Sequence, residues 1–175
     1  MTRLDRIVIV EHCPQWAESF ESARSLVEPL LAGHLVRPVE HIGSTSVPGL
    51  PAKPIIDMLA VVESYEAVGR SLVALTGVGW VAAPEPHDVE QRKWSWCSPS
   101  VAHRAHHLHV VEESSEGWPT WLAFRDHLRT NAEDRVAYAA IKRQLAAVDD
   151  EDRNAYRTGK APFIASVLNR IAPRT

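Results

Sequence analysis

The spacing of apolar residues changes along the chain, and each spacing predicts a type of secondary structure. From Trp16 to Leu30 apolar residues recur about every 3.6 positions, which predicts a helix. Pro14 suits the first turn of this helix and Gly33 suits its end. The short apolar run at residues 7–10 predicts a strand before the helix. The chain therefore opens with a predicted strand and an amphipathic helix.

The middle of the chain is predicted to alternate between strands and loops. Residues 35–42 are expected to be extended, and Pro38 favours an edge position or a bulge because proline cannot donate to a sheet. The continuous apolar run from Ile55 to Val62 predicts a buried strand. A helical spacing covers residues 64–75. Further strands are predicted at three segments: 80–82, 92–97 and 105–111, with a proline-rich loop at 84–91.

Everything after Glu116 is predicted to be helical. The first helix carries a broad apolar stripe: Trp118, Trp121, Leu122, Phe124 and Leu128. Asn131 is expected to cap the next helix, whose predicted inward residues are Val136, Ala140, Ile141, Leu145 and Val148. A last helix is expected to bury residues between Phe163 and Ile171. The order predicts a mixed α/β or α+β fold with C-terminal helices packed on a mixed sheet.

Length and composition place this chain among single-domain proteins. We expect residues 1–175 to form one domain, because 175 residues are enough for one hydrophobic core. The net charge of −3 gives no global attraction to nucleic acid, and no apolar run is as long as a membrane span. The two cysteines, Cys13 and Cys97, are too few for a disulfide scaffold. We therefore expect a cytoplasmic protein without a nucleic-acid or membrane partner, and the sequence predicts no oligomeric state.

The most distinctive stretch runs from His41 to Asp57, and its first half predicts an anion-binding loop. Gly43 permits backbone angles that other residues avoid, and residues 44–46 set three hydroxyls and three N–H groups side by side. Lys53 adds a positive charge that can contact a phosphate. Asp57 then lies in the apolar run, where a carboxylate is costly unless it is paired, hydrogen-bonded or bound to a metal.

A run of histidines provides the second chemical signal. On a strand His107 and His109 share one face, while His106 lies on the other. Two imidazoles at this spacing can bind a transition metal, with Asp57 or His41 as third ligand. One of them could instead act as a general base, or both could hydrogen-bond buried backbone.

Three ordered blocks resemble the GrpB family, also called UPF0157, of the nucleotidyltransferase-fold superfamily. They are residues 41–57, 106–111 and 121–129, and the resemblance covers nearly the whole chain. It implies a nucleotidyltransferase-like α/β domain. In that superfamily a Gly-Ser turn holds nucleotide phosphates, and the following strand offers an Asp-x-Asp pair to magnesium. The second carboxylate position is Leu59 here, so the resemblance leaves the magnesium site incomplete.

The resemblance implies a leading function, which is transfer of a nucleotidyl or phosphoryl group to a small molecule. ATP or another nucleoside triphosphate would be the donor and Mg²⁺ or Mn²⁺ the cofactor. Asp57 would hold the metal, and His107 or His109 would complete the metal shell or act as base. The residues implied for phosphate or substrate are Gly43, Ser44, Thr45, Lys53 and Arg92.

Two alternatives stay open from the residues themselves. The chain could be a non-catalytic nucleotide-binding or small-molecule-binding module, because leucine at position 59 cannot bind magnesium. It could also be a metal enzyme built on His41, Asp57, His107 and His109. A distant glutamate such as Glu112 could replace the missing carboxylate.

Charged residues in the predicted C-terminal helices are expected to have structural roles. Arg125 and Arg129 share a helix face, and Asp126 can pair with Arg129, which predicts a network of ion pairs from helix to sheet or a face toward substrate. Lys142 and Lys160 are expected to be solvated.

Overall fold

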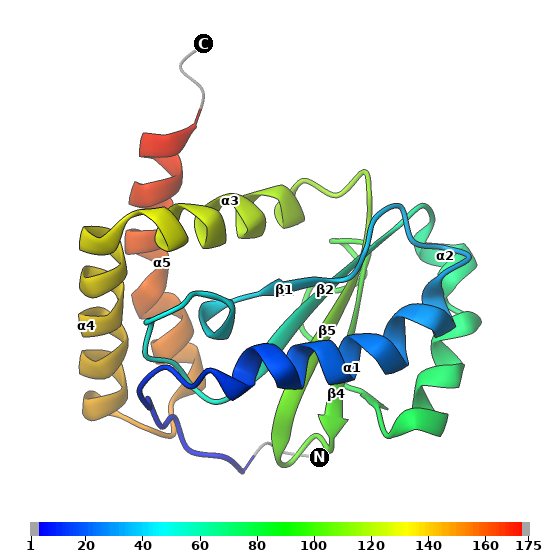
Figure 1. Ribbon diagram of the computed structural model, residues 1–175, viewed down its shortest axis with the longest axis horizontal. Helices are drawn as coiled ribbons and strands as arrows, with labels where there is room; N and C mark the ends of the chain where they lie inside the picture. The colour runs from blue at the N-terminus through cyan, green and yellow to red at the C-terminus, as the bar shows by residue number, and fades with distance from the viewer. Residues whose placement is uncertain (1–3, 173–175) are drawn as a thin grey trace.

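The fold is organised around a five-stranded mixed sheet with the order β1-β2-β5-β4-β3. A computed structural model describes residues 4–172 (Figure 1). The strands are β1 (Glu40–Ile42), β2 (Ile56–Val62), β3 (Val81–Ala82), β4 (Lys93–Pro99) and β5 (Arg104–Glu112). Strands β2 and β5 are parallel and central, and the other pairs are antiparallel.

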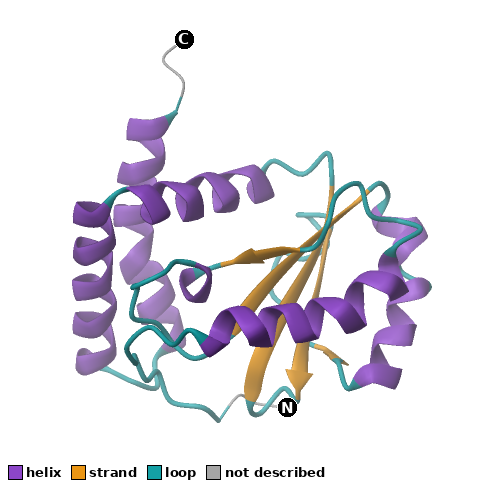
Figure 2. Ribbon diagram, viewed as in Figure 1, coloured by secondary structure: helices purple, strands orange, loops and turns teal. Residues whose placement is uncertain are grey.

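Helices surround this sheet on two sides (Figure 2). They are α1 (Gln15–Leu31), α2 (Tyr65–Val68), α3 (Gly117–Thr130), α4 (Ala132–Val148) and α5 (Arg153–Ile171), with 3-10 turns η1 (Ser44–Ser46) and η2 (Ser71–Val78). Helix α1 crosses one face of the sheet, while α3, α4 and α5 form a layer beside the end of β1 (Figure 1). The prediction of a mixed α/β fold is confirmed. No helix in the described part of the chain is long and apolar enough to cross a membrane.

Alternation along β2 and β5 divides their side chains between two environments. Met58, Ala60 and Leu108 point toward α1 and η2 and form the main core. Leu59 and Val61 point the other way and pack under α3. Because strand side chains alternate, Asp57, His107 and His109 share the face of Leu59. This face is covered by α3 at one end and open at the other.

The helical layer packs on the sheet less extensively than predicted. Trp121 and Leu122 of α3 pack over the strands. Helices α4 and α5 pack on α3, on each other and on Val47 and Leu50 of the loop after η1, forming a second small core around Tyr138. The helices therefore stand beside the sheet, and only α3 lies over it.

Several local predictions are wrong because packing overrides the apolar pattern. Residues 7–10 form one isolated bridge, between Val10 and Ala52, instead of a strand. The predicted helix over 64–75 is broken into α2 and η2 at Gly69. Helix α4 is rotated so that Tyr138, Ala139 and Lys142 face inward, and the predicted inward residues Val136 and Val148 are 69% and 82% exposed.

Candidate metal centre

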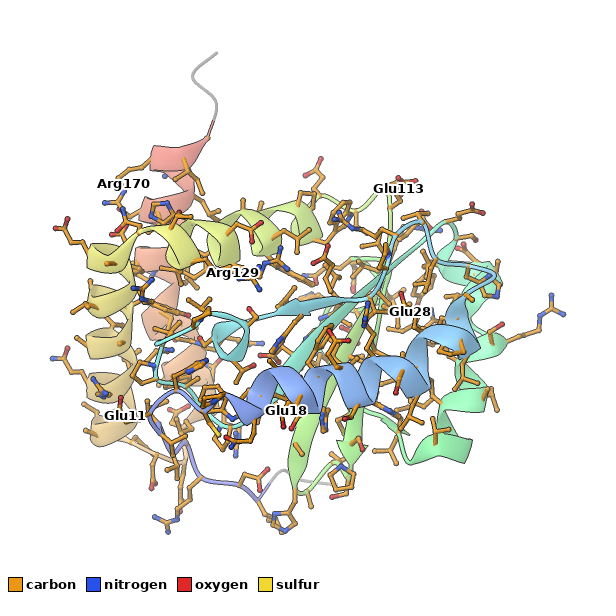
Figure 3. The ribbon with its side chains drawn as sticks, in the orientation of Figure 1. Glu11, Glu18, Glu28, Glu113, Arg129 and Arg170 are labelled. Carbon is orange, nitrogen blue, oxygen red and sulfur yellow. The ribbon has the colours of Figure 1, made fainter. Side chains whose placement is uncertain are left out.

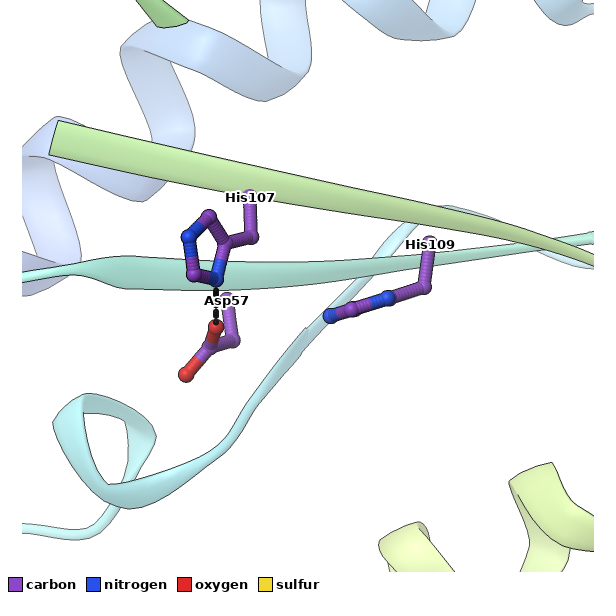
Figure 4. A group of neighbouring side chains, drawn as sticks. All are labelled: Asp57, His107 and His109. Carbon is purple, nitrogen blue, oxygen red and sulfur yellow. Dashed lines mark hydrogen bonds and ion pairs between the residues drawn. The ribbon is translucent and has the colours of Figure 1, made fainter. Parts of the chain in front are cut away.

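Three side chains that can bind a metal meet on the open face of the sheet. Asp57 and His107 are cross-strand neighbours in the parallel β2–β5 register, and His109 lies two residues further along β5. His107 Nδ1 lies 3.0 Å from Asp57 Oδ1, and each residue has a ligand atom within 4.8 Å of those of the other two. Figure 4 shows all three pointing into the same space. The predicted shared face of His107 and His109 is confirmed.

Electrostatics hold two of these groups in the states that bind metals. Burial alone would raise the pKa of Asp57, but the hydrogen bond from His107 and the nearby His107, His109 and Lys53 bring that pKa down to about 2. Burial lowers the pKa of His109 to about 4, although the Asp57 carboxylate opposes this. At neutral pH Asp57 is therefore a carboxylate and His109 a neutral imidazole.

The donor set suits a divalent transition metal. Two imidazoles and one carboxylate form the set that binds non-haem iron and related ions. His107 Nε2 and His109 Nδ1 are buried and have no hydrogen-bond partner within residues 4–172. Buried polar atoms without partners are costly, so this cluster has bonding capacity left for a ligand.

Leu59 stands where the family resemblance implies a second carboxylate, and its side chain offers no metal ligand. Leu59 is fully buried under α3 with Val61 and Trp121. Its register partner on β5 is His109. The third possible ligand therefore comes from the neighbouring strand instead of from position i+2 of β2. A ring nitrogen of His109 in place of a carboxylate oxygen at position 59 favours transition metals over magnesium.

His41 does not join this cluster, which corrects its expected role as a ligand. It pairs with Met58 in the β1–β2 register and therefore lies on the α1 face, where it stacks on Phe20 with ring centroids 4.6 Å apart. Its Nε2 lies 3.0 Å from Thr45 Oγ1, and that hydroxyl donates to the Ile55 carbonyl. His41 and Thr45 thus fix the loop from beneath.

The Gly-Ser loop, residues 43–46, passes directly beside the cluster of Asp57, His107 and His109. Gly43 has a φ of 69°, and a Cβ built there would lie 2.4 Å from Asp57 Oδ2. Only glycine allows both this conformation and this close approach. Ser44 and Lys53 line the same cavity as Asp57. The loop predicted to bind an anion is therefore placed at the cluster.

Replacing Gly43 by alanine is expected to lower the free energy of unfolding by about 2 kcal/mol, because alanine is strained at positive φ and its methyl group collides with Asp57. We also expect weaker metal binding, since the carboxylate must move. Urea unfolding and metal titration would measure the two effects. Gly49→Ala is the matched control: Gly49 has a φ of 76° but no heavy atom within 4 Å of an added Cβ. Equal metal affinity in both variants would contradict this account.

A cavity of about 740 Å³ lies between the open face of the sheet and helices α3, α4 and α5. Among its described lining residues, eight are basic and two are acidic, Asp57 and Glu85. The basic residues are Lys53, Lys93, Arg104, Arg125, Lys142, Arg153, Arg157 and Lys160. Arg153 Nη1 and Nη2 are buried and have no hydrogen-bond partner within the described chain. The cavity is therefore suited to an anion.

Two of these cations were expected to be solvated, and that prediction is wrong. Lys142 is 1% exposed, and Lys160 lies with its Nζ 4.5 Å from the centroid of the Tyr156 ring. Burial lowers the pKa of both amines. The sequence of α5 indicates this basic face, because its residues have the spacing i, i+3, i+4 and i+7 of one helix face: Arg153, Tyr156, Arg157 and Lys160.

Arg92 and Glu112 lie outside this cavity and bind each other. Arg92 Nε donates to Glu112 Oε1 at 2.7 Å, and Arg92 Nη2 also pairs with Glu66. Glu112 accepts from the Tyr65 backbone N–H as well. The structure therefore places Arg92 and Glu112 in an ion pair outside the cavity, and not beside Asp57 where substrate binding and a replacement carboxylate were expected.

The ion pairs predicted between helix and sheet are present on α3. Arg125 donates to Glu40 Oε2 at 2.8 Å and to the His41 carbonyl at 3.0 Å. Arg129, which is labelled in Figure 3, lies on α3. It donates to the Ser46 carbonyl and pairs with Asp126. These contacts fix α3 to β1 and to the Gly-Ser loop, so they hold the cavity wall against the cluster.

Fold and site together define a mixed α/β protein with a candidate transition-metal centre in a basic cavity. The protein family described as GrpB protein matches residues 6–170, and the chain belongs to this family. A UPF0157 protein of Pseudomonas aeruginosa is 34% identical over 172 residues, which are 98% of this chain and 70% of that protein. The glutamate-rich protein GrpB of Alkalihalophilus pseudofirmus is 29% identical, with 94% of this chain and 95% of that protein covered.

A solved structure has a similar fold. The crystal structure of the conserved protein GrpB from Enterococcus faecalis matches with a TM-score of 0.81 and 29% identity. The match covers 93% of this chain and 98% of that one.

Proposed function

We propose that this protein is a metal-dependent enzyme that acts on an anionic small molecule. The observation that carries the proposal is the meeting of Asp57, His107 and His109 on the floor of a basic cavity. These residues would hold a divalent ion such as Mn²⁺, Fe²⁺, Co²⁺ or Zn²⁺. When bound, such an ion polarises a carbonyl or phosphoryl oxygen of the substrate, or activates water.

The residues of the cavity wall support an anionic substrate. Arg153 and Lys160 of α5 line the cavity from the helical layer, and Lys53 lines it from the loop side. The Arg153 guanidinium can form two parallel hydrogen bonds to one phosphate or carboxylate. Because the wall is cationic and the floor carries Asp57, a substrate would direct its anionic group toward α5 and its reacting group toward the metal.

A second candidate is nucleotidyl or phosphoryl transfer from a nucleoside triphosphate with Mg²⁺ or Mn²⁺ on a nucleotidyltransferase-like fold. The position of the Gly43–Ser44 loop beside Asp57 favours it, as does the number of cations available to phosphates. Leu59 counts against it, because one carboxylate holds Mg²⁺ weakly. Without turnover, the same pocket would serve a non-catalytic nucleotide-binding or small-molecule-binding module. We place either activity in the cytoplasm, where free thiols such as Cys13 and Cys97 persist.

Metal titration calorimetry on tag-free, metal-stripped protein tests the first proposal. We expect Mn²⁺, Co²⁺ and Zn²⁺ to bind at one site per chain and Mg²⁺ to bind much more weakly. Thermal shifts with pyrophosphate and with ATP, compared with adenosine, then test the anionic substrate. Binding of Mg²⁺ alone, together with an ATP shift that requires it, would favour the nucleotidyltransferase. Absence of any metal binding would contradict both proposed activities, the transition-metal enzyme and the nucleotidyltransferase.

A further inference from the structure

A second group of reactive side chains lies in the same cavity, between the Gly-Ser loop and α4. Lys142 Nζ is 3.0 Å from Ser44 Oγ and donates a hydrogen bond to the Pro51 carbonyl. Tyr138, one helical turn before Lys142, lines the same cavity, and its ring centroid is 4.9 Å from Lys142 Nζ. Nothing in the metal-binding cluster uses these groups. A serine hydroxyl thus lies between a buried amine and the cavity.

The ionisation of Lys142 and Tyr138 allows proton transfer from the Ser44 hydroxyl to Lys142. Burial, with the nearby Lys160, Arg143 and Lys53, lowers the pKa of Lys142 to about 7. A neutral amine can donate one N–H to the Pro51 carbonyl and accept the Ser44 hydroxyl proton on its lone pair. Burial raises the pKa of Tyr138, so its phenol keeps its proton. Ser44 and Lys142 then have defined roles in one hydrogen-bond chain.

Exposure separates the roles of serine and lysine. Ser44 is half-buried and lines the cavity, so a substrate can reach its hydroxyl. Lys142 is 1% exposed and contacts the Ser44 hydroxyl. Activation of a serine by an adjacent lysine is an established alternative to the Ser-His pair. A buried amine behind an accessible hydroxyl is the arrangement that this activation requires.

We propose that Ser44 is a catalytic nucleophile for acyl transfer and that Lys142 is the base that takes its proton. The substrate class is an ester of an anionic small molecule. Its anionic character rests on the proposed function, whereas the roles of the serine and the lysine do not. The reactive centre is distinct from the metal ligands but adjoins them, since Gly43 lies against Asp57.

The proposed reaction consumes one water molecule and needs no other co-reactant. Lys142 Nζ takes the Ser44 hydroxyl proton while Oγ forms a bond to the ester carbonyl carbon. The bond from that carbon to the leaving oxygen breaks, and the leaving alkoxide takes the proton from the Lys142 ammonium. Water then attacks the acyl-serine, gives one proton through Lys142 back to Ser44 Oγ, and releases the acid.

Labelling with an alkyl fluorophosphonate tests this proposal. Serine attack forms an O–P bond and expels fluoride, and peptide mass spectrometry locates the adduct. The protein is first stripped of metal with a chelator, so a failure of the metal proposal does not affect the result. We expect the adduct on Ser44, and we expect its rate to fall at least about 100-fold in Lys142→Arg, whose guanidinium stays protonated and cannot act as a base.

Controls distinguish a reactive pair from a structural contact. Lys142→Met removes the amine with little change in volume and should also lose labelling, so it decides the question if the arginine variant does not fold. Ser98→Ala removes a hydroxyl on β4 that donates to the Gly79 carbonyl away from the cavity, and it should label at the wild-type rate. An adduct formed at the wild-type rate in a folded Lys142 variant would overturn the proposal. So would the absence of any Ser44 adduct in folded wild-type protein.

Discussion

Replacing Asp57 by asparagine is expected to weaken binding of Mn²⁺, Co²⁺ or Zn²⁺ by about 100-fold or more. The change removes the only carboxylate among the three clustered ligands and its negative charge, while an amide keeps nearly the same shape. Altering the partner of a metal ligand already costs about 10- to 100-fold in affinity, so loss of a ligand should cost at least as much. Calorimetric titration of wild type and variant would measure the ratio.

The adjacent histidines supply a matched control for this experiment. His107→Gln should lose affinity as Asp57→Asn does, because His107 lies in the cluster. His106→Gln changes the preceding residue on the same strand, but His106 faces the α1 side, with its ring centroid 5.9 Å from that of Trp80. This variant should bind metal like wild type. Equal losses of metal affinity in His106→Gln and His107→Gln would show that the metal does not bind at the cluster.

Replacing Lys142 by methionine is expected to remove the part of the pH dependence of the unfolding free energy that the buried Lys142 amine causes. In wild type the folded-state pKa of Lys142 is lowered from 10.5 to about 7, so between these values the unfolded chain binds more protons than the folded one. Wild-type stability therefore rises with pH across this window, and the lysine carries its full penalty below pH 7. The difference in unfolding free energy between wild type and Lys142→Met should change by about 4 kcal/mol from pH 6.5 to pH 10.

The sign of this change identifies its cause. At low pH the variant should be more stable than wild type, because the buried wild-type ammonium is charged there. At high pH the variant should be less stable than wild type, because the neutral wild-type amine keeps its hydrogen bond to Pro51. Urea unfolding at several pH values measures the difference, and groups common to both proteins cancel. Lys160→Met is a useful comparison, because Lys160 contributes to the lowered pKa of Lys142. A pH-independent difference would mean that Lys142 titrates normally.

The two predictions concern opposite walls of the same cavity. The proposed metal ligands lie on the sheet, and Lys142 lies on α4, whose inward face meets the loop at Val47 and Leu50. The Gly-Ser loop connects the walls, since Gly43 lies against Asp57 and Ser44 contacts Lys142. Arg125 and Arg129 hold α3 to this loop and to β1. A substrate in the cavity would therefore meet rigid elements on both sides.

The sequence by itself determined the elements whose pattern is local. The apolar spacing predicted α1, and the apolar run predicted β2, because periodicity of 3.6 or continuous burial is encoded within each segment. Asn131 was identified as a cap, and its side chain accepts from the Asp134 N–H at 2.8 Å. Alternation along β5 placed His107 and His109 on one face. The absence of a second carboxylate at Leu59 was also evident from sequence alone.

Only the tertiary structure decided which residues meet. The parallel register of β2 with β5 puts Asp57 beside His107, and the antiparallel register of β1 turns His41 to the opposite face. No local pattern encodes a register between strands about fifty residues apart. Lys142 is a similar case: its sequence neighbourhood is that of a solvated helix, and its burial follows from how α4 is rotated against the loop. Registers and helix rotations are set by the packing of the whole molecule, and these determined the site.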